Sequence, residues 1–480
     1  MSQIAAMIGG LISVPILTRI LTREDYGRLS LILLAVSFFT SFARLGIPQS
    51  ITRYLPEYGK SGQEQARHYV SSVFIFSLAS SSCIALSFSA AGFLARGSPW
   101  DSWAVYIALF GILLFNEVLL STLSEVYRAQ QRSLFTSLIG IISRYSTLAA
   151  SLLFFFLVSR TLVSFLAGKA SIQTVLILVF VIPLFRWKFI RLQKIDFGIV
   201  RQAIRYGLPL SLATAGGFFI AYGDRYVIQK LLNTVEVARY SLPYDIVQQA
   251  ETALTTPLRM AIVPLVFTMM LNDGEEKASV FLSQVVRGVL LLIIPMVFGL
   301  SFLARDIILL LGSSKYADSS QLLPILSAGI LVGGINFLIT TGLSFQKRTD
   351  IIAYMTIGSG VLNILMNLAL IPFMGVFGSA WATLISYSLH LFVSYRLSSR
   401  YLRIRFYPVS LIKSFAAATL MISVLFAAGR FLPAGNIGLL FKIPLAVAVY
   451  GAGICLFDAD VRGFATRILR RASLLPMGSA

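Results

Sequence analysis

The stretch that organises this chain is RILTREDYGRLSL at residues 19–31, which returns at residues 230–242 as KLLNTVEVARYSL. The two copies lie 211 residues apart. A second match joins AQQRS at 129–133 to FQKRT at 345–349. Self-similarity at such long spacing indicates an internal repeat. The identical pairs of the first match are Leu21/Leu232, Arg28/Arg239, Ser30/Ser241 and Leu31/Leu242, and the pairs that keep their charge are Arg19/Lys230 and Asp25/Glu236.

Apolar segments long enough to cross a membrane recur along the whole chain. The 480 residues are 57% hydrophobic and 12% charged, whereas an average soluble protein is about a quarter charged. Because backbone groups in lipid must find partners within helices, the sequence predicts an all-α polytopic membrane protein with about fourteen transmembrane helices. The predicted spans are 2–21, 27–48, 68–94, 100–125, 133–158, 162–185, 205–231, 236–268, 280–303, 320–345, 349–371, 376–397, 408–429 and 437–457.

The repeat unit contains six of these spans, and an even number preserves membrane orientation. We therefore expect two parallel six-helix repeats about a central cavity, with the substrate path between them, as in many transporters. Two further helices follow the repeats. The predicted domains are an N-lobe at 1–190, a C-lobe at 191–400, the last two helices at 401–460 and a cytoplasmic tail at 461–480.

The basic residues indicate the orientation. The loops after the second, fourth, sixth, eighth, tenth and twelfth spans, with the C-terminal tail, carry about twice as many Lys and Arg as the opposite loops, which predicts cytoplasmic termini. The net charge of +20 is thus a topology signal, and we do not expect nucleic-acid binding. Met1–Leu21 lacks a basic n-region and a cleavage site, so it is interpreted as the first span; whether Met1 is the true start stays open.

Cysteine and histidine give no sign of a disulfide framework or metal site. Cys83 and Cys455 lie in different apolar spans, and His68 and His390 are isolated. We expect the two histidines to be ordinary loop or helix-surface residues. No Walker A sequence and no catalytic cluster is readable, so the sequence does not predict an enzyme or an ATPase.

Three segments resemble a known superfamily, and they occur in its order: PILTRILTREDYGRLSLILL at 15–34, LGIPQSITRYLPEY at 45–58 and YGLPLSLATAGGFFIAYGDRYVIQKLL at 206–232. The chain resembles the multidrug/oligosaccharidyl-lipid/polysaccharide (MOP) exporter superfamily, in particular its polysaccharide transporter and O-antigen flippase (Wzx-like) branch, and more distantly the lipid II flippase. The resemblance implies two six-helix lobes that face a central cavity and work by alternating access. It also implies that the last two helices, absent from drug-extruding relatives, form a groove for a lipid tail.

Charged residues inside spans are the first candidates for function, because a bare charge in a membrane is costly. Arg44 lies two to three turns inside the span 27–48, Arg144 near the middle of 133–158, and Arg259 inside 236–268. Each is a candidate for binding an anionic pyrophosphate head, since Arg binds phosphate bidentately. The alternative is a packing salt bridge or a side chain that reaches the interface.

Two further features belong to the same predicted cavity. Glu117 is expected at the same depth as Arg144 across a helix hairpin, which suggests an ion pair between them. The span 236–268 is unusually polar, and a stripe at helical spacing is expected to face water rather than lipid. The stripe comprises Gln248, Glu251, Thr252, Thr255 and Arg259.

A set of hard oxygen ligands suggests a cation site in the second half. Asp224 lies on the span 205–231, and the resemblance to the lipid II flippase implies a sodium site made with residues of two later spans. These are Asn363, Asn367, Ser379 and Thr383, which fall on the matching positions. This chain departs from that pattern because Asn367 replaces an acidic residue, which removes one charge. The alternative is hydrogen bonding between helices.

The sequence therefore favours a flippase that moves an undecaprenyl-pyrophosphate-linked oligosaccharide to the periplasmic leaflet of the inner membrane, driven by Na⁺, H⁺ or the membrane potential. Expected partners are the lipid-linked oligosaccharide, membrane lipids and polysaccharide polymerase or assembly proteins. A cation-coupled drug antiporter of the same fold is the nearest alternative. A membrane polymerase or glycosyltransferase would need a large catalytic loop, and a scaffold would not need the polar stripe.

Overall fold

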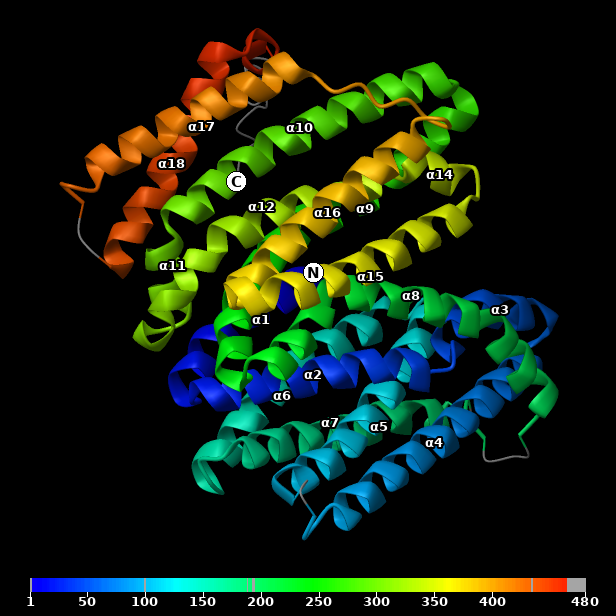
Figure 1. The fold of residues 1–480 in the computed structure, drawn as a ribbon. Coiled ribbons are helices and arrows are strands. Elements are labelled where there is room, and N and C mark those ends of the chain that lie inside the picture. Colours follow the sequence, from blue (N-terminus) through cyan, green and yellow to red (C-terminus); the bar gives the residue numbers. More distant parts are fainter. Residues whose placement is uncertain (1, 99–100, 188, 192–194, 433–434, 464–480) are drawn as a thin grey trace, which may run out of the picture. The chain divides into compact units, whose positions relative to one another are not determined.

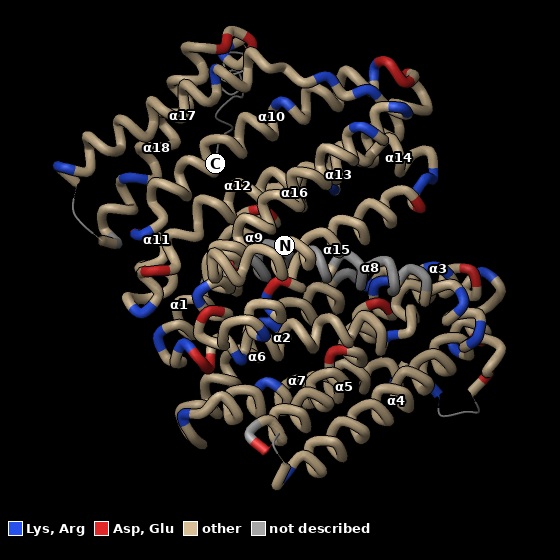
Figure 2. The backbone as a smooth tube through the Cα atoms, viewed as in Figure 1, with Lys and Arg blue, Asp and Glu red and all other residues tan. Residues whose placement is uncertain are grey.

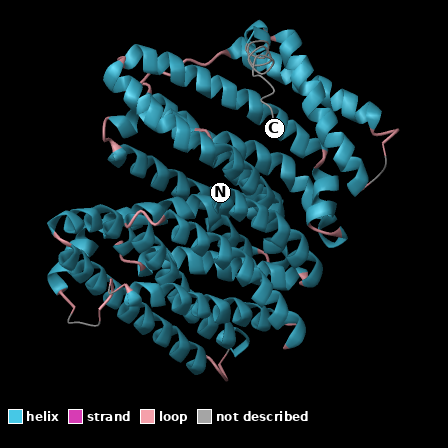
Figure 3. Cartoon of the chain, turned by 180° about the vertical axis from the view of Figure 1, so that it is seen from behind, coloured by secondary structure: helices cyan, strands magenta, loops and turns pink. Residues whose placement is uncertain are grey.

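The chain folds into helices throughout the part that the structure describes. The computed structural model describes residues 2–98, 101–187, 189–191, 195–432 and 435–463, and no strand occurs among them (Figure 3). The predicted tail at 461–480 lies outside the described residues from 464 onward. The structure divides into two compact units, unit 1 at 1–226 and unit 2 at 227–480 (Figure 1). This division falls within a helix, whereas the predicted boundary between the N-lobe and the C-lobe lies between residues 190 and 191. The limits of the four predicted domains stay a prediction.

Unit 1 is a bundle of long helices. Its main packing pairs are α4 with α5, α6 with α7, and α5 with α7, while α3 packs on α4 and α5. Leucine, valine and tyrosine side chains of these helices form a buried core around Leu119, Leu123 and Tyr127. The helices are α1 Ser2–Ile20, α2 Arg23–Ala43, α3 Ile47–Ser61, α4 Gln63–Leu94, α5 Asp101–Ala129, α6 Ser133–Leu157, α7 Leu162–Arg186 and α8 Phe197–Leu231, which continues past the division.

Unit 2 begins in the last turn of α8 and contains the remaining helices. Helix α15 packs on α16, α12 packs on α16, and α10 packs on α17, which pairs with α18. The helices are α9 Thr234–Asn272, α10 Glu275–Phe302, α11 Ala304–Leu311, the 3₁₀ segment η1 Ser314–Leu322, α12 Leu323–Gly333, α13 Asn336–Ile339, α14 Thr341–Phe345, α15 Thr349–Met374, α16 Val376–Ser398, α17 Pro408–Ala428 and α18 Asn436–Phe457.

The expected polytopic architecture is confirmed. In the described residues, 12 helical segments are long and apolar enough to cross a membrane. The other two predicted spans, 2–21 and 205–231, coincide with helices α1 and α8. Large apolar side chains stand exposed on the helices, among them Leu157, Phe373 and Leu440. Such a surface is unsuited to water and fits contact with lipid. Lys, Arg, Asp and Glu gather mainly at helix ends and in the loops (Figure 2).

Two predicted spans are interrupted. The span 320–345 is broken into α12, α13 and α14. The span 27–48 ends early, because α2 stops at Ala43 and α3 starts at Ile47. Between them Leu45 and Gly46 adopt φ values of 48° and 76°, which lie in the left-handed region and end a right-handed helix.

Gly46 also meets the backbone of another helix. A Cβ on Gly46 would lie 1.9 Å from the carbonyl carbon of Gly207 in α8, and a Cβ on Gly207 would lie 1.9 Å from the oxygen of Gly46. Only glycine fits at either position, because any larger residue would overlap main-chain atoms. The break between α2 and α3 is therefore fixed by both backbone conformation and packing.

The internal repeat has the same local geometry in both copies. Thr22 caps α2 by accepting a hydrogen bond from the Asp25 amide, and Asn233 caps α9 by accepting one from the Glu236 amide. In the second match, Gln131 and Lys347 both adopt left-handed backbone, with φ values of 58° and 57°. The repeat is thus visible in helix caps and turns as well as in residue identities.

Helices α17 and α18 are tied to the rest of unit 2 at both ends of α18. Arg287 of α10 donates to both carboxylate oxygens of Asp458 at 2.9 Å, and Ser410 donates to the same carboxylate at 2.6 Å. Burial opposes ionisation of Asp458, but these hydrogen bonds outweigh it and lower its pKa to about 2. At the other end Lys442 donates to Asp306 at 2.6 Å. Between them a small apolar core joins α10, α17 and α18.

Candidate substrate cavities and cation-binding residues

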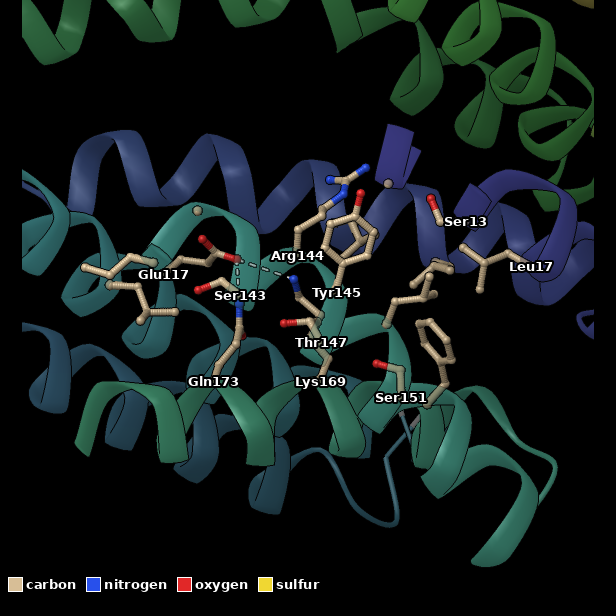
Figure 4. A pocket seen from close by; sticks show the side chains of 18 of the residues that line it. Ser13, Leu17, Glu117, Ser143, Arg144, Tyr145, Thr147, Ser151, Lys169 and Gln173 are labelled. Carbon is tan, nitrogen blue, oxygen red and sulfur yellow. Dashed lines mark hydrogen bonds and ion pairs between the residues drawn. The ribbon is translucent and has the colours of Figure 1, made fainter. Parts of the chain in front are cut away.

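Unit 1 contains a cavity of about 430 Å³ lined by residues of α1, α2, α5, α6 and α7. Its walls are otherwise apolar helices, so the polar side chains that enter it are conspicuous (Figure 4). Three of the lining residues are ionisable at neutral pH, namely Glu117, Arg144 and Lys169. Two of these, Glu117 and Arg144, belong to the predicted substrate site, and the structure brings them to one cavity.

The predicted ion pair between Glu117 and Arg144 is wrong. Glu117 instead accepts hydrogen bonds from Lys169 Nζ at 3.4 Å and from Gln173 Nε2 at 2.9 Å. Lys169 and Gln173 lie one turn apart on α7, so both reach the same carboxylate. The error arose from matching depth alone, because two residues at one depth of a hairpin can still point to different sides of their helices.

Arg144 points away from Glu117, toward α1 (Figure 4). Its aliphatic part fills the space above Gly9, where an added Cβ would lie 2.9 Å from Arg144 Cγ. Among the described residues no hydrogen bond or ion pair to Arg144 is found. The cavity therefore holds two cations and one carboxylate, a net positive charge in an otherwise apolar bundle.

Arg44 lies at the break between α2 and α3, where it caps the C-terminus of α2, rather than two to three turns inside a span. The early end of α2 explains the difference. The carboxylates that act on its charge are those of Glu117 and Glu125. Its Nε is buried and has no hydrogen-bond partner among the described residues. Arg44 thus adds to the positive charge near Glu117 without lining the cavity.

Unit 2 contains a second polar cavity, of about 280 Å³, lined by residues of α9, α12, α13, α15 and α16 and of the turns next to α13. The predicted residues Gln248, Glu251 and Arg259 all line it. They come from α9, whose polar stripe was expected to avoid lipid. The structure therefore brings together, in this one cavity, all the predicted substrate-binding residues of the second half.

Glu251 is held in place by its own helix. Its carboxylate accepts from Thr255 at 2.9 Å, from Gln248 at 2.9 Å and from Thr252 at 3.3 Å. Arg259 makes no hydrogen bond or ion pair within the described residues, and its guanidinium lies 4.9 Å from the ring centre of Phe337. That distance allows a cation–π interaction. The cavity thus joins a fixed carboxylate to a guanidinium that is free to meet a ligand.

Four of the five predicted cation-coupling residues lie in unit 2, and all four are buried. Asn367 donates to the backbone oxygen and the side-chain oxygen of Asn363, and Thr383 shares a 2.9 Å hydrogen bond with Tyr240. Asn367 Oδ1 and Ser379 Oγ are buried without a hydrogen-bond partner among the described residues. Hard oxygens of this kind suit a small cation, whereas the unpartnered amide nitrogen of Asn363 does not.

Asp224, the fifth residue, belongs to unit 1. It is fully buried, and its carboxylate accepts from the amide of Arg225 at 2.8 Å. Arg225 is itself buried and donates to Ser30 at 3.3 Å. Because Asp224 and the other four residues lie in different units, the five-residue cation site stays a prediction. Among the described residues no cluster of three His, Cys, Asp or Glu side chains could hold a metal ion.

Sequence reasoning missed several residues of these sites. Lys169 lies within an apolar span, and the rule that singled out the three arginines applies to it equally. Gln173 could have been found as its neighbour one turn later. Asn336, which lines the second cavity, carried no pattern that sequence alone could reveal. The expectation that His390 is a loop or helix-surface residue is wrong, because its side chain is buried on α16, 3.2 Å from Asn336 Nδ2.

Two family models match the chain. The model described as polysaccharide biosynthesis protein covers residues 1–270, and the model described as lipid II flippase MurJ covers residues 246–437. Among curated proteins, the chain is 25% identical over 358 residues to the probable low-salt glycan biosynthesis flippase Agl15 of Haloferax volcanii. That match covers 71% of each chain.

Solved structures of the same fold agree. The lipid II flippase MurJ in an inward closed conformation has a TM-score of 0.71 at 16% identity, over 96% of this chain and 98% of that one. A multidrug resistance MATE family transporter of the MOP superfamily, in an inward-facing conformation, has a TM-score of 0.66 at 14% identity, over 83% and 94%. The chain thus has the fold of the MOP superfamily transporter structures. Since the first family model covers more than half of the sequence, this chain belongs to the polysaccharide biosynthesis protein family and is a membrane transporter of the flippase type.

Proposed function

We propose that this protein flips an undecaprenyl-pyrophosphate-linked oligosaccharide, the repeat unit of an O-antigen, exopolysaccharide or capsule, from the cytoplasmic to the periplasmic leaflet by alternating access. The observation that carries the proposal is the excess positive charge of the cavity in unit 1. Arg144 and Lys169 both line it, and Glu117, which pairs with Lys169, is its single carboxylate. An anionic pyrophosphate head would supply the charge that balances this cavity.

The chemistry of the two cations suits a phosphate ligand. A guanidinium donates two parallel hydrogen bonds to phosphate oxygens, and an ammonium acts as a compact point charge. Both interactions strengthen when water is scarce, because the effective dielectric constant falls. Glu117 holds Lys169 in position and leaves Arg144 available to the ligand.

Directed movement needs a source of energy, and the sequence has no nucleotide-binding motif. One elementary charge crossing 100 mV releases about 2.3 kcal/mol, which biases an equilibrium roughly 50-fold. The coupling ion is Na⁺ or H⁺, bound by Asp224 together with Asn363, Asn367, Ser379 and Thr383. The buried, unpartnered oxygens of Asn367 and Ser379 support this assignment.

The nearest alternative is a drug antiporter of the same fold. An excess of positive charge in the cavity disfavours the cationic compounds that such proteins extrude. The multidrug transporter structure also covers a smaller share of this chain than the lipid II flippase structure does. A membrane polymerase or scaffold has no comparable support from the cavities.

The proposal places the protein in the inner membrane with both termini in the cytoplasm, in contact with membrane lipids and with the polysaccharide polymerase or assembly proteins that receive the flipped glycan. The distribution of basic residues supports this orientation.

Deletion of the gene tests the function. We expect a lipid-linked oligosaccharide to accumulate in the cytoplasmic leaflet, detectable by mass spectrometry of extracted lipids. The wild-type gene should clear it, and Arg144→Ala should clear it poorly. Arg160→Ala, an exposed arginine just after α6, is the matched control and should behave as wild type. No accumulation in the deletion strain would refute the proposal.

A further inference from the structure

We propose that the cavity of unit 2 binds one neutral sugar ring of the lipid-linked glycan. This inference rests on the proposed function and deepens it, because it separates recognition of the glycan from recognition of the phosphate. The two cavities differ in net charge, and this difference points to two different parts of the same ligand.

The charge of the second cavity is balanced. Its charged lining residues are Glu251 and Arg259, and their opposite formal charges cancel. The cavity of unit 1 instead has two cations for one carboxylate. A ligand with no charge of its own fits the balanced cavity, and an anionic ligand fits the other. A lipid-linked glycan contains both kinds of group, since its sugar is neutral and its pyrophosphate is anionic.

The uncharged polar side chains of this cavity suit the hydroxyl groups of a sugar. Gln248, Asn336 and Thr340 offer neutral amide and hydroxyl groups to the cavity. Each sugar hydroxyl both donates and accepts a hydrogen bond, so such mixed groups can satisfy it. The carboxylate of Glu251 adds strong acceptor capacity, since its two oxygens have about four lone-pair sites and Gln248, Thr252 and Thr255 use three of them.

Asn336 is held in one orientation. Its Nδ2 lies 3.2 Å from Nε2 of His390, and because an amide nitrogen can only donate, His390 accepts this hydrogen bond as a neutral ring. His390 is therefore a positioning residue for the cavity. A polar group that is already fixed loses less entropy when a ligand binds.

Aromatic residues complete the cavity. Phe337 and Tyr387 line it, together with the aliphatic Ile330 and Ile352. The apolar C–H face of a sugar ring can pack against such surfaces while its hydroxyls bond to the polar groups. A volume of about 280 Å³ lies just below the usual range for ligand pockets, about 300–1,000 Å³. The cavity therefore accommodates a single ring rather than a lipid tail.

Two glycines create the space. A Cβ on Gly333 would lie 2.4 Å from Cδ1 of Tyr387, and a Cβ on Gly334 would lie 2.8 Å from Oε1 of Glu251. They stand where α12 ends and the helix is interrupted before α13. The interruption that the sequence did not predict thus lets Tyr387 and Glu251 lie directly against backbone.

The experiment compares two lipids on the full-length protein in nanodiscs. One probe is the glycan-bearing lipid that accumulates in the deletion strain, and the other is undecaprenyl pyrophosphate without sugar. Retained lipid is counted by mass spectrometry. We expect wild-type protein to prefer the glycan-bearing lipid. Gln248→Ala should lower that preference about 3- to 10-fold, as expected for one lost hydrogen bond, while retention of the bare lipid is unchanged.

Two comparisons make the result decisive. Gln249→Ala, the adjacent glutamine that does not line the cavity, should keep the wild-type preference. Arg144→Ala should lower retention of both lipids equally. The sugar site is overturned if Gln248→Ala also lowers both equally, which would mark an anion site, or if it changes neither. Failure of wild-type protein to retain either lipid above empty nanodiscs would instead overturn the proposed function itself, and the sugar site with it.

Discussion

Lys169 Nζ lies 3.4 Å from Glu117 Oε1, and this ion pair joins α7 to α5 within the apolar bundle of unit 1. Neither residue is fully exposed, with side-chain exposures of 17% and 33%. This pairing engages the cavity's single carboxylate with Lys169, one of the two cations in the cavity. It leaves Arg144 as the cation that a ligand would meet.

Removing one partner of this pair should destabilise the protein more than removing both partners. Lys169→Met leaves the Glu117 carboxylate without its cation, whereas Lys169→Met combined with Glu117→Gln removes both charges. We expect the single variant to melt at a lower temperature than the double variant, with a coupling energy of about 0.5–3 kcal/mol. Melting of purified protein in detergent measures this. Lys230→Met, at an exposed helix end, serves as control; equal melting of single and double variants would contradict the pairing.

Lysine should replace each of the three arginines only partly. Arg44→Ala, Arg144→Ala and Arg259→Ala should each lower polymer export at normal protein levels. Arg→Lys should rescue partly at each site, because the charge survives and the bidentate fork does not. Export assays with immunoblots check this. Full export by all three alanine variants would remove the role of cations in substrate binding.

The coupling of lipid flipping to an ion gradient should depend on Asp224. Asp224→Asn should abolish ion dependence and slow transport, and Asn367→Asp should tighten cation binding by adding a second carboxylate. Flipping in vesicles at fixed pH with varied sodium, and at fixed sodium with varied pH, separates the two ions. Equal flipping with both gradients collapsed, together with wild-type behaviour of Asp224→Asn, would show a passive facilitator.

The attachment of α17 and α18 should weaken in acid. The pKa of Asp458 is about 2 in the fold against an ordinary value of 3.8, so its carboxylate contributes stability above pH 3.8 that is lost as the pH falls through 2. We therefore expect Asp458→Asn to melt below wild type at pH 7 and the gap to shrink below pH 4. Melting at several pH values measures it. A gap that is constant with pH would mean that ionisation of Asp458 does not matter.

Topology can be tested with reporter fusions. Fusions after Gln131, Lys194, Arg348 and Arg403 should report the cytoplasm, and fusions near Arg160 and Lys315 the periplasm. Lys194 lies outside the described residues, but the reporter does not depend on its structure. A periplasmic signal at Lys194 would break the model of two parallel repeats.

The sequence predicts the repeated architecture well, because membrane helices must be long, apolar and internally hydrogen-bonded. Thr22 and Asn233, which are equivalent positions of the repeat, cap their helices in the same way in the structure. The stripe from Gln248 to Arg259 was found because helical spacing fixes which residues share a face.

The failures have a different origin. The Glu117–Lys169 pair and the break at Gly46 depend on which helices become neighbours and how they rotate. Hydropathy and depth do not contain that information. Only packing chooses Lys169 over Arg144 as the partner of Glu117, and only the approach of Gly207 shows why α2 stops short of the predicted end.

The contact between Gly46 and Gly207 also has a mechanical consequence. Helices usually hold their register because side chains of one fit between those of the other. At this point backbone meets backbone, whereas farther along α3 the side chains of Tyr54 and Tyr58 contact Tyr206 and Gln202 of α8. A larger residue at either glycine would therefore do more than overlap main-chain atoms: it would push α8 away from α3 and separate these side-chain contacts as well.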